Sequence, residues 1–278
     1  MSNMLVRSLS GLVYIVIIVG AIMLGQAAFL GLTLLFAVLA TIEFDHLCQN
    51  QEHNRYLTST LDAVGSILLV TSCGLAATSI RMSLPFAICY VLWVLVRLTT
   101  GLYLHHTNQI EALSRSMMSQ LYIAMPLGVL NFLYAYTPAI VLLMFVMIWL
   151  NDTGAYLVGS SMGRTRLFER ISPKKSWEGF WGGLAFAAIA GFLASRFVSE
   201  IGGVAPTGVW AAYGVVVGVV ATLGDLVESL IKRTLNVKDS GRLIPGHGGI
   251  LDRIDSLLFV APASVVFVFG LRLLSGLF

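Results

Sequence analysis

Charged side chains gather in one short stretch of an otherwise apolar chain, and their types could do chemistry. The stretch Ser229–Asp255 holds acids, cations and one histidine between two hydrophobic runs. A charged side chain at the centre of a membrane costs about 2.5–3.5 kcal/mol on insertion scales. We therefore expect this stretch to be a water-exposed loop that also forms a site.

Two pairs of acids have helical spacing, one just before this stretch and one at its end. Asp225, Glu228 and Lys232 fall at i, i+3 and i+7, so they share one face of a helix. The two acids could bind a cation, or could simply pair with Lys232. Asp252 and Asp255 are also three residues apart, at the start of a hydrophobic run. Acids there also suit the positive end of a helix dipole, which needs no site.

A further acid, Asp152, lies upstream in an apolar and aromatic run. An acid in such surroundings is expensive, so we expect it to face the interior of a helix bundle or a wet cavity. The alternative is an acid at a helix end among lipid headgroups.

A basic segment follows Asp152 and ends in Lys174, Lys175 and Ser176. The spacing GxxxxGK[ST] of a phosphate-binding loop is absent. Ser176 could cap the next helix, with Glu178 in its first turn. A helix amino terminus beside two lysines would attract a polyphosphate. The alternative is ordinary cytoplasmic loop charge.

Glycines precede the second pair of acids and make a pliable loop that could close over a ligand. The loop contains His247, which alone is weak support for a base or a metal ligand. Mg²⁺ prefers oxygen ligands and is usually held by one or two carboxylates plus substrate phosphates. Carboxylates beside basic, phosphate-binding segments therefore suggest metal-assisted transfer on a nucleotide's phosphates. The spacing does not name the substrate.

The composition places these residues in a membrane protein. Of the 278 residues, 57% are hydrophobic and 11% are charged, whereas soluble domains carry about 25% charged residues. We predict an all-α, polytopic helical bundle with about nine transmembrane helices, since each span needs about 20 apolar residues. The predicted spans are 6–24, 27–47, 59–80, 84–103, 118–136, 138–158, 178–198, 207–231 and 252–275. Longer polar loops are expected at 43–58 and 101–117.

The distribution of cations sets the expected orientation. Ten of the seventeen Lys and Arg lie in Arg164–Lys175 and Lys232–Arg253. These clusters follow the sixth and eighth spans, so the positive-inside rule places them and the amino terminus in the cytoplasm. They lie between hydrophobic spans, so phosphates or anionic headgroups are expected partners and nucleic acid is not. We expect residues 1–137 to be a transmembrane scaffold and 138–278 the catalytic region.

The run from Ser229 to Asp255 resembles the signature of the phosphatidate cytidylyltransferase family, also called CDP-diacylglycerol synthases. It reads S-x2-KR-x4-KD-x-G-x3-PGHGG-x2-DR-x-D. Asn151–Tyr156 and Ser172–Gly179 resemble the upstream motifs of that family, and Glu43-Phe44 resembles a weaker acidic–aromatic feature. Asn151 departs from the family pattern, because many members are expected to have a small residue such as Ala at this position.

The resemblance implies that CTP and phosphatidic acid give CDP-diacylglycerol and pyrophosphate. It implies that the lipid phosphate attacks the α-phosphorus of CTP, with Mg²⁺ as cofactor and room left for a second cation. The implied metal ligands are Asp225, Asp252, Asp255 and Asp152, and the implied catalytic residues are Asp225, Asp252, Asp255, Lys232 and His247. The implied substrate-binding residues are Lys174, Lys175, Ser176, Arg233, Lys238, Asp239 and Arg253.

The resemblance also implies a bacterial cytoplasmic membrane, an active site on the cytoplasmic side and a homodimer. Two rival functions stay open from the residues. A transporter or channel would also use acids within a membrane, although no inverted repeat is evident. A lipid or polyprenol kinase that uses CTP would release CDP instead of pyrophosphate.

Overall fold

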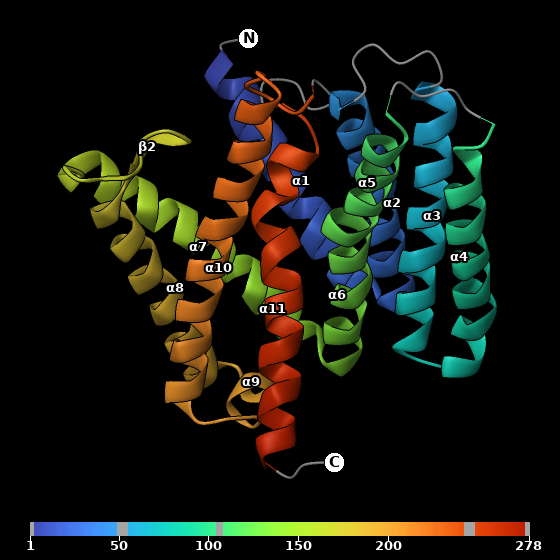
Figure 1. Ribbon diagram of the computed structural model, residues 1–278. Coiled ribbons are helices and arrows are strands. Elements are labelled where there is room, and N and C mark those ends of the chain that lie inside the picture. Colours follow the sequence, from blue (N-terminus) through green and yellow to red (C-terminus); the bar gives the residue numbers. More distant parts are fainter. Residues whose placement is uncertain (1–2, 49–54, 104–107, 242–247, 276–278) are drawn as a thin grey trace. The chain divides into compact units, whose positions relative to one another are not determined.

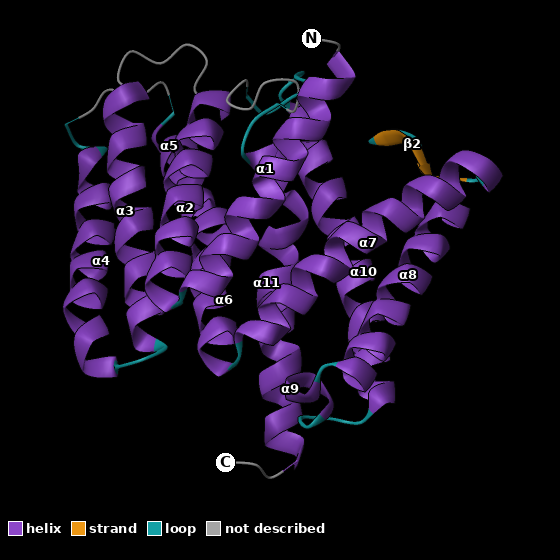
Figure 2. Cartoon of the chain, turned by 180° about the vertical axis from the view of Figure 1, so that it is seen from behind, coloured by secondary structure: helices purple, strands orange, loops and turns teal. Residues whose placement is uncertain are grey.

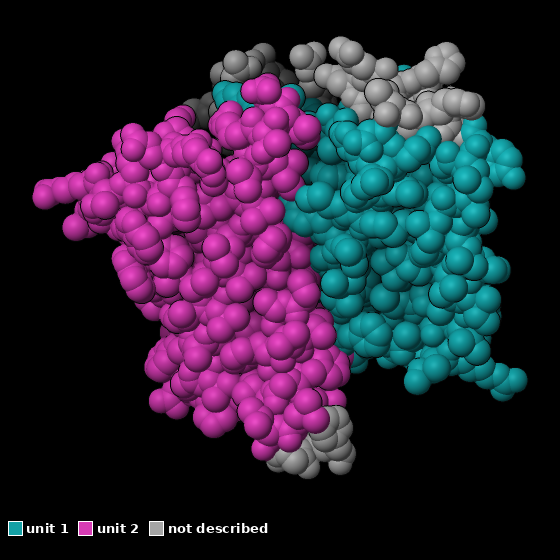
Figure 3. All heavy atoms as spheres, in the orientation of Figure 1, with its two compact units in different colours: residues 1–135, 237–254 teal, residues 136–236, 255–278 magenta. Residues whose placement is uncertain are grey.

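The computed structural model describes residues 3–48, 55–103, 108–241 and 248–275. Nearly all of them are helical (Figures 1 and 2), which confirms the predicted all-α membrane fold. Within these described ranges, eight helices are long and apolar enough to cross a membrane, and α1 adds a shorter apolar stretch, Leu9–Leu24. Each of the nine predicted spans falls on one of these helices. The chain separates into two compact units (Figure 3).

The first unit contains residues 1–135 and 237–254. Its helices are α1 (Asn3–Leu24), α2 (Gln26–Cys48), α3 (Arg55–Ala76), α4 (Ile80–Thr100), α5 (Gln109–Ser119) and α6 (Met125–Tyr136), with a π-helical turn, η1 (Gln120–Ala124), between the last two. Helix α2 packs against α1, α3 and α5, and α3 packs against α4.

Two polar loops that the sequence predicted in this unit are shorter than expected. Helix α2 continues to Cys48 and α3 begins at Arg55, so most of 43–58 is helical among the described residues. Helix α5 occupies much of 101–117, because the Asn108 side chain accepts a hydrogen bond from the backbone N–H of Glu111 and caps it. Glu43 consequently lies within a helix.

Buried polar groups tie the first unit together. The Arg97 guanidinium donates to Asp62 Oδ1 over 2.9 Å, with both side chains at most 1% exposed. Ser116 donates to the other oxygen of the same carboxylate, and Gln120 donates to the Asp62 carbonyl over 3.0 Å. Residues on α3, α4, α5 and η1 thus share one polar network, as expected where no water can satisfy buried polar groups.

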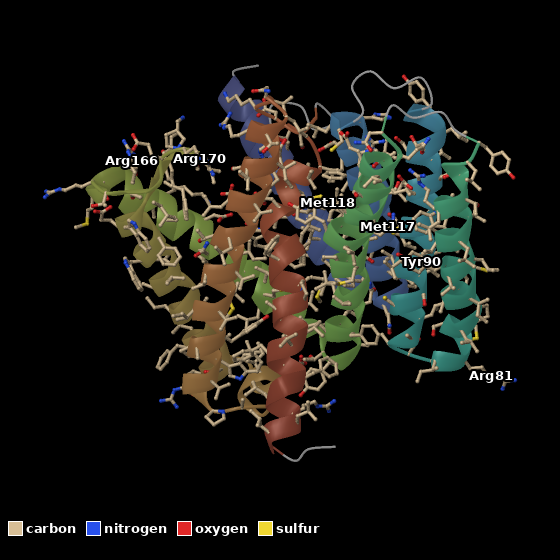
Figure 4. All side chains as sticks on the ribbon, viewed as in Figure 1. Arg81, Tyr90, Met117, Met118, Arg166 and Arg170 are labelled. Carbon is tan, nitrogen blue, oxygen red and sulfur yellow. The ribbon has the colours of Figure 1, made fainter. Side chains whose placement is uncertain are left out.

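The second unit contains residues 136–236 and 255–278. Its elements are α7 (Pro138–Met162), β1 (Arg166–Phe168), β2 (Ser172–Ser176), α8 (Trp177–Phe197), α9 (Ser199–Gly202), α10 (Thr207–Thr234) and α11 (Leu251–Ser275), which begins in the first unit. Strands β1 and β2 form an antiparallel hairpin. The basic segment is therefore a short hairpin rather than an irregular loop, and Figure 4 marks Arg166 on β1 and Arg170 in its turn.

Small residues bring the helices of the second unit close together. A Cβ on Gly214 would overlap the Ala187 carbonyl, and one on Gly191 would overlap the Trp210 carbonyl, so α8 and α10 touch backbone to backbone. Helix α7 packs along α8. The carboxyl ends of α7 and α10 and the hairpin lie at the same end of this unit (Figure 1).

Candidate active site

Three carboxylates converge in the second unit. Asp225 and Glu228 lie on α10 and Asp255 on α11, and each offers an oxygen within 4.8 Å of the others. The helices can approach here because residue 224 is glycine: a Cβ would lie 2.8 Å from the Asp255 carbonyl oxygen. Ser256 strengthens the contact by donating to the Ala221 carbonyl over 3.1 Å. We call Asp225, Glu228 and Asp255 the acidic cluster.

Two lysines partly neutralise the acidic cluster. Lys175 Nζ on β2 lies 2.5 Å from Asp225 Oδ2. Lys232 Nζ lies 2.5 Å from Glu228 Oε2, one helical turn away, and the Glu228 side chain is only 1% exposed. The pairing with Lys232 that the sequence offered for Glu228 is thus present, and Glu228 also lies in the acidic cluster.

A cavity of about 440 Å³ opens beside Asp225. Its polar lining includes Asp152, Lys174, Lys175 and Ser176, and its apolar lining includes Tyr156, Leu167 and Phe180. Cations and acids therefore meet apolar surface in one recess built by α7, the hairpin, α8 and α10. Such a recess can hold a ligand with phosphates at one end and a less polar group at the other.

The amino terminus of α8 supports the basic side of the cavity. Ser176 accepts a hydrogen bond from the Gly179 N–H over 3.1 Å, which confirms the predicted cap. Glu178 reaches back and accepts from the backbone N–H groups of Arg164 and Thr165. The hairpin is thus fastened to the helix, and Lys174 and Lys175 on β2 are held beside the helix terminus.

Asp252 makes hydrogen bonds with a different set of residues, in the first unit. Its Oδ2 accepts hydrogen bonds from the Ser240 N–H, the Ser240 hydroxyl and the Gly249 N–H, each over 2.9 Å. Gly248 has φ +82°, a conformation that favours glycine, and a Cβ there would overlap the same carboxylate. One Asp252 oxygen therefore organises the chain before α11.

The structure gathers some of the predicted site residues and leaves others apart. Asp225 and Asp255 join the acidic cluster, and Asp152, Lys174, Lys175 and Ser176 line the cavity. Arg233 Nε lies 3.5 Å from the Ile171 carbonyl oxygen. Lys238 and Asp239 are exposed. Arg253 is half-buried, with its carbonyl accepting from Tyr14, and His247 lies outside the described residues.

Two acids were absent from the predicted set of site residues. Glu228 shares a helical face with Asp225, so its spacing was the available signal. Glu43 accepts hydrogen bonds from the backbone of Ile250 and Leu251, more than 200 residues away. Its only signal in the sequence was the resemblance of Glu43-Phe44 to a family feature.

The acidic cluster fits a divalent cation by its chemistry. Its donors are all carboxylate oxygens, which hard cations such as Mg²⁺ prefer over nitrogen or sulfur. They come from two helices that are packed against each other, and Glu228 is buried, so the donor set is held in place. The second unit therefore contains a group of residues that can hold a metal ion.

Comparisons with known proteins find relatives over part of this chain. A phosphatidate cytidylyltransferase of Synechocystis sp. is 47% identical over 133 residues, or 46% of this chain and 43% of that protein. One of Staphylococcus aureus is 48% identical over 124 residues, or 44% of this chain and 46% of that protein. The aligned stretch spans less than half the length of these relatives.

A family model covers far more of the chain than these pairwise alignments do. The model of the cytidylyltransferase family matches residues 5–271, which reach from the first turn of α1 to the last turns of α11 and include every predicted site residue. The match confirms the resemblance that the motifs indicated: the chain belongs to the cytidylyltransferase family.

Proposed function

We propose that this chain transfers the cytidylyl group of CTP to phosphatidic acid, giving CDP-diacylglycerol and pyrophosphate. The observation that carries the proposal is the acidic cluster beside the lysine-lined cavity, in a chain of the cytidylyltransferase family. The names of the relatives, phosphatidate cytidylyltransferases, support the choice of lipid substrate.

The reaction needs positioning and charge neutralisation more than it needs a protein nucleophile. An oxygen of the lipid phosphate forms a bond to the α-phosphorus of CTP, and the bond from that phosphorus to pyrophosphate breaks. The attacking group is already an anion, so no side chain has to remove a proton. The protein holds the two polyanionic substrates together and stabilises the charge that shifts to the leaving group.

The residues divide this work by their positions. Lys174 and Lys175 bind phosphate oxygens in the cavity, next to the amino terminus of α8. Asp225, Glu228 and Asp255 would hold Mg²⁺, and Asp152 would support the same charge from α7. The bound cation would supply further neutralisation of the triphosphate. Tyr156 and Phe180 offer apolar surface to the less charged part of a substrate.

The membrane context completes the proposal. One basic cluster lies at the hairpin and the other begins at the carboxyl end of α10, and by the positive-inside rule both would face the cytoplasmic side of a bacterial membrane. CTP would then arrive from the cytoplasm while the lipid tails stay among the helices. The homodimer that the resemblance implies stays a prediction, which the mass of the purified protein in detergent would test.

The deciding experiment uses CTP labelled at the α-phosphate with purified protein, phosphatidic acid and Mg²⁺ in detergent. We expect label in a lipid product and one pyrophosphate released for each labelled lipid. Label in the lipid from γ-labelled CTP, with CDP released, would indicate a kinase instead. Ion flux into proteoliposomes without CTP, and no lipid product, would indicate a transporter.

A further inference from the structure

Glu43 on α2 holds the chain at the start of α11. Its Oε2 accepts a hydrogen bond from the Ile250 N–H over 2.9 Å, and its Oε1 accepts from the Leu251 N–H over 3.0 Å. The Ser240 hydroxyl also contacts Oε1. All four residues belong to the first unit. One carboxylate thus gathers three groups that lie about 200 residues further along the chain.

Two glycines lie close to the Glu43 carboxylate. A Cβ on Gly249 would overlap the Glu43 carboxylate, and a Cβ on Gly241 would lie 2.6 Å from its Oε2. Neither glycine has positive φ among the described residues, so backbone conformation does not explain them. A side chain at either position would have to displace the Glu43 carboxylate.

The position of Glu43 also suits the end of a helix. The first N–H groups of a helix have no partner within it, and the helix dipole places positive charge there. Leu251 is the first residue of α11, and its N–H is one of these groups. Glu43 therefore caps α11 from a different helix with a carboxylate that the dipole stabilises.

Glu43 and Asp252 hold the same short segment. Ser240 and Gly249, which contact Glu43, also donate hydrogen bonds to Asp252 Oδ2. The Ser240 hydroxyl lies between the two carboxylates and has one proton to donate. Asp252 is the second residue of α11, and Asp255 follows one turn later on the same helix. The place where α11 begins thus depends on Glu43.

We infer that Glu43 is a positioning residue, which fixes the first turn of α11 and the Asp252 carboxylate for the reaction. The expected effect of Glu43 on turnover rests on the proposed function, whereas its hydrogen bonds to the backbone of Ile250 and Leu251 do not. An acid that only helped α2 to fold would need no contact with Gly249, and its replacement would not change turnover.

The test pairs Glu43→Gln with Glu111→Gln, the same substitution at an exposed position on α5. An amide nitrogen cannot accept from a backbone N–H, so Glu43→Gln leaves one donor without its acceptor. We expect kcat to fall about tenfold or more with KM for CTP changed less than about threefold. Amide hydrogen exchange in a peptide covering 249–254 should quicken, and Glu111→Gln should match the native protein in both measurements.

A second pair of variants tests the close contact itself. Gly249→Ala places a methyl group against the carboxylate, and Glu43→Asp withdraws that carboxylate by one methylene. We expect Gly249→Ala to lose activity and the double variant Glu43→Asp/Gly249→Ala to recover at least about fivefold of it. A purely structural acid would make the two losses add.

The outcomes separate the inference from the proposed function. If the native protein forms no labelled lipid, the proposed function is contradicted. Hydrogen exchange then still tests whether Glu43 holds the backbone at the start of α11. Active native protein with unchanged kcat and exchange in Glu43→Gln overturns the inference. If Glu43→Gln does not fold, the double variant decides, and additive losses there overturn it as well.

Discussion

Lys175 Nζ lies 2.5 Å from Asp225 Oδ2, which joins the hairpin to helix α10. The two side chains are 27% and 35% exposed, so the pair faces the cavity rather than the protein interior. A lysine so placed can move between the carboxylate and an arriving phosphate. When Lys175 moves away, Asp225 loses its partner lysine, and a cation bound by the acidic cluster can neutralise its charge instead.

This pairing predicts a defect in substrate binding when Lys175 loses its charge. Lys175→Met should raise the KM for CTP about tenfold, since a phosphate contact is lost, while Lys175→Arg keeps part of the binding. Steady-state kinetics at saturating lipid would measure this. Arg196→Met, at an exposed position near the end of α8, is the control and should change nothing. An unaltered KM in Lys175→Met would assign that lysine to folding alone.

Lys174 provides a second, weaker case. It lines the same cavity but is exposed, so we expect Lys174→Ala to raise the KM for CTP by about threefold. The measurement is the same titration. Equal KM values for Lys174→Ala and the native protein would mean that Lys174 adds charge to the hairpin without contacting CTP.

The acidic cluster predicts that Glu228 contributes to cation binding. Asp225→Asn and Asp255→Asn should lower turnover by about a hundredfold or more, and Glu228→Gln should raise the Mg²⁺ concentration for half-maximal activity by about tenfold. A titration of activity against Mg²⁺ would measure both, with the exposed Glu200→Gln as control.

Glu228 also pairs with Lys232, and a double variant separates the two roles. Glu228→Gln alone leaves Lys232 without its partner and should also lower stability. If Glu228 served only to neutralise Lys232, the double variant Glu228→Gln/Lys232→Met should recover both the stability and the Mg²⁺ response that Glu228→Gln loses. We expect it to regain stability only. Recovery of the native Mg²⁺ response would remove Glu228 from the acidic cluster's function.

Removal of divalent cations should stop the reaction and leave the fold intact. The carboxylates of the acidic cluster repel one another without a cation, but Lys175 and Lys232 offset part of that charge. We expect chelation to abolish lipid product and added Mg²⁺ to restore it, with an unchanged unfolding temperature within about 5 °C. An undiminished rate after exhaustive chelation would contradict the metal assignment.

The buried Asp62–Arg97 pair predicts a large effect on stability in the first unit. Asp62→Asn or Arg97→Met leaves a buried charge without its partner, so each should destabilise by about 3–5 kcal/mol. The double variant Asp62→Asn/Arg97→Met should lose less than the sum. Thermal unfolding in detergent would measure this, with Glu111→Gln as control. Single variants as stable as the native protein would show that water or lipid reaches the pair.

The sequence by itself determined the membrane class, the spans and the character of the site. Apolar runs of about 20 residues must become helices in a bilayer, because no other open structure satisfies the backbone there. The spacing of Asp225, Glu228 and Lys232 places them on one face of a helix. The boundaries were less certain: α2 and α5 extend into predicted loops, since a cap such as Asn108 decides where a helix begins.

Only the tertiary structure decided which residues meet. Asp255 joins Asp225 and Glu228 because Gly224 lets two helices approach, and Lys175 reaches Asp225 because a hairpin folds back on α8. Glu43 reaches the start of α11 from the other end of the chain. Helical periodicity relates residues within about two turns of one another, whereas contacts between helices depend on which faces pack, and that follows from the whole fold.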